Sequence, residues 1–180
     1  AHAASAFYLS PFEEAAIVTM DGAGEYETTT TSFGSREGIK RQSSVQLPNS
    51  IGLFYSALTA FLGFKVNEGE YKVMGMAAYG HPEYYEPLRR LVSLEENGAF
   101  SFDTNFFEFL CPEDYPFKKP LIDLLGKPRD PESAFSIKEG EDGVSKKTVK
   151  ECKRFANIAA STQKVAEDII LHVSKHALAN

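Results

Sequence analysis

The sequence has few cysteines, no long apolar run and no excess of basic residues. Its two cysteines, Cys111 and Cys152, lie far apart and form neither a CxxC pair nor a Cys/His ligand spacing. This pattern suggests neither a disulfide framework nor a structural zinc site, and it favours a reducing, cytoplasmic setting. No stretch approaches the roughly 20 apolar residues that span a bilayer, and the first residues lack a signal-peptide pattern. We therefore expect no membrane partner.

Charge and composition further narrow the functional classes to which the protein can belong. The net charge is -6, with acidic and basic residues mixed along the chain, which disfavours the broad basic surface of a nucleic-acid binder. The 180 residues, 43% of them hydrophobic, suffice for one domain or a large piece of one. The sequence also lacks a GxSxG motif, a Walker A loop and a Rossmann fingerprint.

The first part of the sequence predicts a small antiparallel sheet. The opening residues, Ala1 to Tyr8, predict a helix that is already under way, which suggests a piece of a longer protein. Strand-forming patterns follow at three places, joined by a turn at residues 21–24 and by a second connection at residues 34–38. The predicted strands are Ala15 to Met20, Glu25 to Phe33 and Ile39 to Leu47. The expected fold is α/β, with a three-stranded antiparallel meander packed with helices.

A helix is predicted directly after the sheet. Its apolar residues recur at helical spacing from Ile51 to Leu62, with Asn49 or Ser50 as the N-terminal cap. Gly63 is expected to end it, because glycine tolerates the left-handed conformation that follows many helices.

Helical patterns continue in the rest of the chain. Two shorter helices are expected, at about Lys72 to Ala78 and at Pro82 to Leu94. From about Ser145 onward, one long helix is predicted, and its apolar stripe consists of Phe155, Ile158, Thr162, Val165, Ile169, Ile170, Val173 and Ala177. We expect a sheet-and-helix core at 1–94, an irregular insertion at 95–145 and the long helix at 146–180.

A glycine-rich segment at the end of the first predicted strand is a candidate ligand site. In Asp21-Gly22-Ala23-Gly24, the missing side chains let backbone N–H groups approach an anion, and the carboxylate can face a metal. Asp-Gly is also the commonest kind of tight-turn dipeptide, so the segment taken alone favours a plain hairpin turn.

His2 and Asp21 are the candidate metal ligands. One lies in a predicted helix and the other at a strand end, so the fold can bring an imidazole and a carboxylate to one cation. Mixed nitrogen and oxygen donors suit iron, manganese or zinc, and a usable site needs at least a third ligand. The spacing alone favours a surface histidine beside an Asp-Gly turn.

A second polar segment follows the first predicted long helix. Asn67, Glu68, Glu70 and Lys72 lie close together among glycines. A lysine can neutralise phosphate, and a carboxylate can accept hydrogen bonds from ribose hydroxyls. The same pattern is typical of a solvated loop at a helix start, where an acidic residue favours the helix dipole.

Several segments, taken together, resemble the O-carbamoyltransferases of nodulation-factor and antibiotic biosynthesis. Their order and spacing match over most of the chain, which makes the resemblance more specific than any single motif. The segments are His2 to Phe7, Ser10 to Ala16, Asp21 to Glu25, Pro48 to Ser56, Gly63 to Ala77 and Ala156 to Gln163.

The resemblance implies part of an actin-like ATPase (RNase H-like) domain. In this family a separate domain makes carbamoyl-adenylate from carbamoyl phosphate and ATP, and the carbamoyl group passes to a hydroxyl of a small-molecule or glycan acceptor. An iron-type metal is held by two histidines spaced HxxxH and by aspartates; His2 matches the second histidine and Asp21 one aspartate. The first histidine would precede Ala1, and further ligands would follow residue 180, so the fragment alone is expected to be inactive.

The same resemblance implies roles for the glycine-rich segments. Asn67, Glu70 and Lys72 would line the nucleotide pocket, and Gly22 and Gly24 would lie at its reacting end. The expected cofactors are iron or another divalent metal, together with ATP or carbamoyl-adenylate. An actin-like module that binds nucleotide without carbamoyl chemistry is the alternative function, because a shared fold does not fix the chemistry. No residue is assigned a catalytic role.

Overall fold

A computed structural model describes residues 1–110, 115–131, 133–139 and 145–179. The chain divides into two compact units. The first comprises Ala1–Leu53, Val92–Phe102 and Glu167–Asn180, and the second comprises Phe54–Leu91 and Asp103–Ala166. The division falls inside two helices, so each unit contains one part of both.

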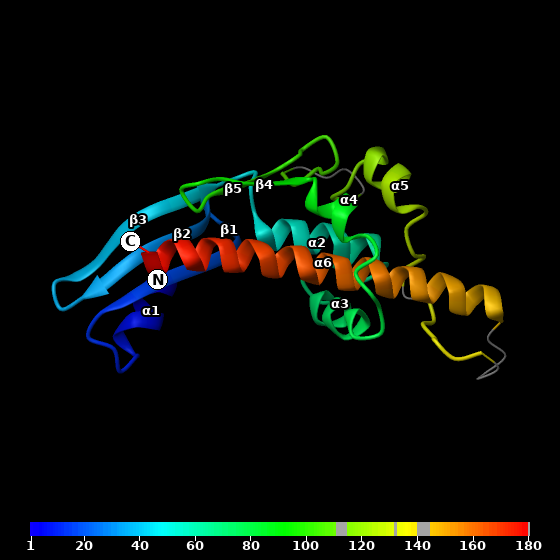
Figure 1. The fold of residues 1–180 in the computed structure, drawn as a ribbon, viewed down its shortest axis with the longest axis horizontal. Helices are drawn as coiled ribbons and strands as arrows, with labels where there is room; N and C mark the ends of the chain where they lie inside the picture. The colour runs from blue at the N-terminus through cyan, green and yellow to red at the C-terminus, as the bar shows by residue number, and fades with distance from the viewer. Residues whose placement is uncertain (111–114, 132, 140–144, 180) are drawn as a thin grey trace. The chain divides into compact units, whose positions relative to one another are not determined.

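The first unit is built on the predicted meander. Strands β1 (Ala15–Gly24), β2 (Glu27–Ser35) and β3 (Gly38–Gln46) form an antiparallel sheet in the order β1-β2-β3 (Figure 1). Helix α1 (His2–Tyr8) precedes the sheet, and its one buried residue is Phe7. A Cβ at Gly34 of β2 would lie 2.7 Å from the Phe7 ring, so glycine at this position lets α1 pack closely on the sheet. The predicted α/β class and the three-stranded sheet are confirmed.

The prediction of a turn at residues 21–24 is wrong, because the turn lies further along the chain. Strand β1 continues through Gly24, and the chain reverses at Glu25 and Tyr26. Glu25 has a φ of 58°, the left-handed conformation that a tight reversal demands. The Asp-Gly dipeptide instead forms an irregularity within the strand pair, because the register shifts between Met20 and Gly24.

Ser50, rather than Asn49, caps helix α2 (Ile51–Phe61). The Ser50 hydroxyl accepts a hydrogen bond of 3.1 Å from the backbone N–H of Leu53. The Asn49 side chain accepts one of 3.0 Å from the backbone N–H of Phe102. Gly63 has a φ of +74° shortly after α2 ends. This is the left-handed conformation expected of a glycine that ends a helix.

The predicted helix at Pro82 to Leu94 is too long. Helix α4 covers only Tyr85–Arg89, and Val92–Leu94 forms strand β4, which pairs antiparallel with β5 (Phe100–Phe102). Val92, Phe100 and Phe102 are buried. Alternating burial over so few residues is hard to distinguish from helical spacing, although the Asn97-Gly98 dipeptide is a hairpin signal.

Helices form the second unit. It contains α3 (Glu70–Ala77), α4, α5 (Lys119–Leu125) and most of α2. Aromatic contacts fill its core, with ring centroids 5.8 Å apart for Phe54 and Phe107 and 5.2 Å apart for Phe61 and Phe117. Both pairs meet edge to face, the arrangement that the ring quadrupole favours.

The predicted long helix is confirmed as α6 (Lys146–Ala179), drawn in orange to red in Figure 1. Its predicted stripe is buried with one exception: Ile170 is 42% exposed, whereas Ile169 is 1% exposed. Adjacent helical residues point about 100° apart, so both cannot lie on one narrow stripe. Cys152 on α6 is buried and free, and Cys111 lies outside the described residues. Among the helices described, none is both long and apolar enough to cross a membrane.

Candidate functional site

His2 and Asp21 meet within the first unit. The His2 Nδ1 atom lies 3.0 Å from the Asp21 Oδ2 atom. The histidine side chain is 73% exposed and that of the aspartate is 35% exposed. Helix α1 and the end of β1 therefore bring an accessible imidazole and a half-buried carboxylate together, as the sequence prediction of this pair requires.

An irregularity in the pairing of β1 with β2 begins at Asp21. Met20 pairs with Thr29 and Gly24 pairs with Glu27, so residues 21–23 of β1 face only Thr28 of β2. The extra residues cannot all join the ladder. Thr19, two positions before Asp21, lines the same hollow, so Asp21 lies on the face that strand alternation gives it.

His2 and Asp21 line a hollow of about 210 Å³. Its polar lining includes His2, Asp21, Glu27, Arg41 and three threonines of β1 and β2. Glu27 and Arg41 form an ion pair, and Thr19 and Thr30 share a hydrogen bond of 2.8 Å. The hollow therefore combines acceptor oxygens, hydroxyls and a cation, which suits a small polar ligand.

The donor types of His2 and Asp21, an imidazole nitrogen and a carboxylate oxygen, suit a divalent metal. Their separation of 3.0 Å is also that of a direct hydrogen bond between the two groups, so the distance does not by itself indicate a cation. Within the described residues, no group of three or more His, Cys, Asp or Glu side chains is arranged to hold a metal. The pair thus accounts for only part of a coordination sphere.

Gly22 and Gly24 differ in their surroundings. A Cβ built on Gly22 would meet nothing within 4 Å, so a side chain here would extend into open space. A Cβ on Gly24 would lie 3.2 Å from the Glu27 carbonyl oxygen and 3.6 Å from Asp21 Oδ2. Gly24 lines the same hollow as His2 and Asp21, whereas Gly22 does not, and the nitrogen and Cα atoms of Gly22 lie against Gly52 of α2.

The second predicted segment lies in the second unit, where Glu70 begins α3. Its Oε1 atom accepts hydrogen bonds of 3.0 Å from the Ser56 hydroxyl and from the backbone N–H of Asn67. Its Oε2 atom accepts one of 3.2 Å from the backbone N–H of Gly69. The carboxylate thus ties the loop before α3 to itself and to α2.

These contacts also set the charge of Glu70. Burial on its own raises the pKa of this carboxyl, but hydrogen bonds from the backbone of Asn67, Glu70 and Gly69 and from Ser56 outweigh it. The net result is a pKa below the usual 4.5, since donors stabilise the ionised form. Glu70 is therefore held as an anion at neutral pH.

Asn67 and Lys72 flank this carboxylate. Asn67 has a φ of 65°, a conformation that asparagine tolerates better than most residues. The Lys72 ammonium lies 5.6 Å from the centroid of the Phe64 ring. Asn67, Glu70 and Lys72 form one local group in the second unit, and His2, Asp21, Gly22 and Gly24 form another in the first.

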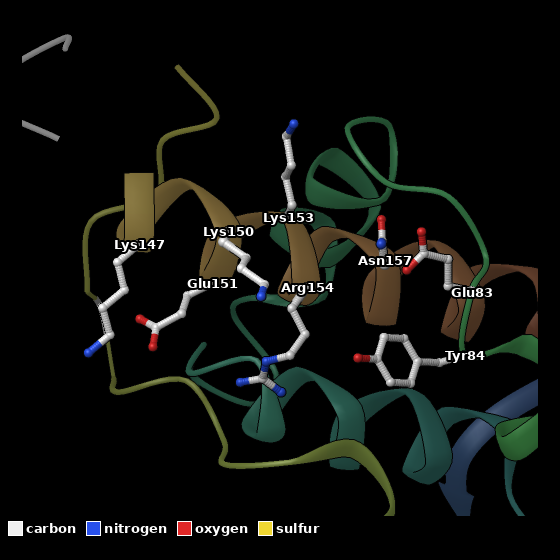
Figure 2. Close-up of a pocket in the computed structure, with 8 residues that line it drawn as sticks. All are labelled: Glu83, Tyr84, Lys147, Lys150, Glu151, Lys153, Arg154 and Asn157. Carbon is white, nitrogen blue, oxygen red and sulfur yellow. The ribbon is translucent and has the colours of Figure 1, made fainter. Parts of the chain in front are cut away.

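A larger hollow, not predicted from the sequence, lies on the second unit. It measures about 530 Å³, and Figure 2 shows its lining residues, four of them basic side chains of α6. Arg154 donates hydrogen bonds of 2.7 Å to the carbonyl oxygens of Leu125 and Lys127, and desolvation lowers its pKa. Asn157 accepts one of 2.9 Å from the N–H of His81. These inner side chains hold neighbouring segments on α6, and the lysines form a solvated rim.

A protein-family model for the carbamoyltransferase N-terminus matches residues 1–180. The chain belongs to the carbamoyltransferase N-terminus family. The resemblance to carbamoyltransferases inferred from the sequence segments is therefore confirmed, and it covers the part that contains His2 and Asp21.

Several relatives cover nearly this whole carbamoyltransferase segment. It is 40% identical to the uncharacterized protein sll1178 of Synechocystis over 96% of the chain and 26% of the relative. It is 30% identical to the nodulation protein NolO of Bradyrhizobium diazoefficiens over 97% of the chain and 27% of the relative. The nodulation protein NolNO of Sinorhizobium fredii is 29% identical over 97% of the chain and 22% of the relative. The chain thus spans about a quarter of the length of these relatives.

Proposed function

We propose that the protein containing this chain is an O-carbamoyltransferase, and that the chain supplies part of its metal-binding and nucleotide-binding surface. Two facts support the proposal: membership of the carbamoyltransferase N-terminus family, and the 3.0 Å contact between His2 and Asp21. The contact carries the argument, because it joins the two donors that the family resemblance assigns to a metal.

The reaction we propose is attack of an acceptor hydroxyl on carbamoyl-adenylate. A carbamate C–O bond forms, the bond between the carbamoyl carbon and the phosphate oxygen breaks, AMP leaves with the electron pair, and the hydroxyl proton passes to water. His2 and Asp21 would hold a divalent cation, with iron as the expected metal, which would supply Lewis-acid stabilisation of the developing negative charge. The carbamoyl-adenylate derives from carbamoyl phosphate and ATP in another part of the protein.

Each predicted residue has a part in this proposal. His2 and Asp21 hold the cation, and Gly22 and Gly24 let the backbone approach the anionic end of the ligand. Lys72 supplies a positive charge for phosphate. Asn67 contributes donors and acceptors, and Glu70 fixes the loop that carries them through its hydrogen bonds to Asn67 and Gly69.

The test uses the intact protein with carbamoyl phosphate, ATP and a hydroxyl-bearing acceptor. Asp21→Ala and His2→Ala are expected to lose bound metal and carbamoyl transfer together, measured by metal analysis and by AMP release. Glu13→Gln is a matched control, because Glu13 is an exposed carboxylate that pairs with Arg36 and takes no part in the proposed site. Removing the metal with a chelator should abolish transfer, and adding Fe²⁺ should restore it.

Two results would contradict the proposal. Full metal content and full rate in Asp21→Ala would exclude Asp21 as a ligand. ATP hydrolysis that is unaffected by carbamoyl phosphate would instead favour the alternative function, a nucleotide-binding module without carbamoyl chemistry. We also expect residues 1–180 alone to be inactive, which an assay of the isolated chain would check.

A further inference from the structure

Residues 21–23 of β1 have too few partners in the sheet to fix their conformation. They face one residue of β2, because the pairs Met20 with Thr29 and Gly24 with Glu27 bracket them. A bulge of this kind disrupts the ladder locally and leaves the extra residues unpaired in it. Contacts from outside the sheet therefore help to fix the backbone at Asp21 and Gly22.

The start of α2 provides this support. The Ser50 hydroxyl lies 2.6 Å from the carbonyl oxygen of Gly22 and 3.1 Å from that of Asp21. The single hydroxyl hydrogen is donated to the nearer carbonyl or shared between both. The same oxygen accepts the hydrogen bond from Leu53 that caps α2. Ser50 is fully buried, so water does not compete for these contacts.

Gly52 lets the helix approach this closely. A Cβ on Gly52 would lie 2.6 Å from the Gly22 Cα atom, 2.8 Å from the Gly22 nitrogen and 3.1 Å from the Asp21 carbonyl oxygen. All three are backbone atoms, so a side chain cannot be accommodated by a rotamer change. Any residue larger than glycine must push the Asp21–Gly22 backbone away from α2.

We infer that Ser50 and Gly52 are positioning residues, which fix the Asp21 carboxylate in the geometry that a metal ion requires. The inference rests on the proposed function of His2 and Asp21 as ligands. It adds a requirement that the ligands themselves do not reveal: the first turn of α2 must contact the strand irregularity for the site to bind metal. Substitution of a residue that orients a metal ligand typically lowers metal affinity by about 10-fold to 100-fold.

The experiment measures Co²⁺ binding to the intact protein by its visible ligand-field absorption. Gly52→Ala is expected to weaken binding about 10-fold to 100-fold and to change the spectrum of any bound ion. Ser50→Ala is expected to weaken binding about 10-fold, and Ser50→Thr, which keeps the hydroxyl, should restore most of the affinity. Because Ser50 also caps α2, thermal unfolding of each variant is measured as well, and a loss of Co²⁺ affinity in a variant that stays folded supports the positioning role.

Gly75→Ala is the matched control for Gly52→Ala. Gly75 also lies in a helix, but a Cβ there would meet nothing within 4 Å, so Co²⁺ affinity and spectrum should remain those of the wild type. Should Gly52→Ala unfold the protein, the Co²⁺ affinity of a folded Ser50→Ala variant still decides the question.

Failure of the inference and failure of the proposed function give different results. If Asp21→Asn loses Co²⁺ while Ser50→Ala and Gly52→Ala bind it as the wild type does, only the positioning role is excluded. If Asp21→Asn itself binds Co²⁺ normally, Asp21 is not a ligand, and the positioning inference is overturned with it.

Discussion

Asp21 and Glu70 are both carboxylates in the predicted ligand-binding segments, and the structure gives them different surroundings. Asp21 lies beside a highly exposed histidine and opens onto a polar hollow. Glu70 accepts hydrogen bonds from Ser56, Asn67 and Gly69. A carboxylate in a glycine-rich segment can therefore either contact a ligand or stabilise its own loop. The hydrogen-bond donors within the chain that surround the carboxylate show which of these two roles it has.

The largest expected difference between the two carboxylates is in metal binding. Asp21→Asn should weaken Co²⁺ or Fe²⁺ binding to the intact protein by at least about 100-fold, because losing a direct ligand costs at least as much as losing an outer-shell partner. Glu70→Gln, which makes the same chemical change, should leave metal affinity unchanged. Calorimetric titration of both variants checks this, and equal losses in both would remove the distinction.

For local stability, substitution of Glu70 is expected to have a larger effect than substitution of Asp21. Glu70→Ala removes an acceptor shared by several donors, and the amides of the loop before α3 should exchange hydrogen about 10-fold to 100-fold faster, equivalent to about 1.4–3 kcal/mol. Asp21→Ala should leave these amides unaffected, and hydrogen-exchange mass spectrometry resolves both regions. Unchanged exchange around Asn67 and Gly69 in Glu70→Ala would show that the observed hydrogen bonds contribute little.

How far the sequence predicts these regions follows from the kind of contact involved. The meander, a cap at Asn49 or Ser50 and the helix from Ile51 depend on local patterns, and the structure confirms them, with Ser50 as the cap. The irregularity at Asp21 depends on how two strands pair, and the requirement for Gly52 depends on a backbone contact with Gly22. Neither is local, so composition and spacing do not reveal them.

The same reasoning applies to the errors. Val92 to Leu94 continues a helical pattern, but pairing with Phe100 to Phe102 makes it a strand. Ile170 satisfies helical spacing in sequence, yet it is exposed beside the buried Ile169. In both cases tertiary contacts select one of two conformations or orientations that the local sequence permits.

A smaller effect than that of Glu70→Ala is expected in the pH dependence of hydrogen exchange in the loop before α3. The pKa of Glu70 is lowered on folding, so its stabilisation is fully present above the unfolded value and is lost as pH falls through the folded value. Protection of the Asn67 and Gly69 amides, corrected for intrinsic exchange, should therefore decline below about pH 4.5. In Glu70→Gln this decline should be absent, and a decline of equal size in both would assign it to another group.

The smallest expected effect on the fold is that of Gly22→Ala, and for this reason the variant tests the ligand directly. A Cβ on Gly22 meets nothing within 4 Å, whereas a Cβ on Gly69 would lie 2.7 Å from the Phe64 Cβ atom and 2.8 Å from the Lys65 carbonyl oxygen. Gly22→Ala should change stability by no more than about 0.5 kcal/mol, and Gly69→Ala should accelerate exchange in the loop before α3.

If the Gly22 backbone approaches the anionic end of carbamoyl-adenylate, the new methyl group of Gly22→Ala obstructs that approach. The affinity of the intact protein for ATP or carbamoyl-adenylate should then fall by up to about tenfold, the equivalent of one hydrogen bond, while hydrogen exchange in β1 stays as in the wild type. Because the structure provides no steric reason for Gly22 within the chain itself, wild-type affinity in this variant would mean that the glycine serves neither the fold nor the ligand.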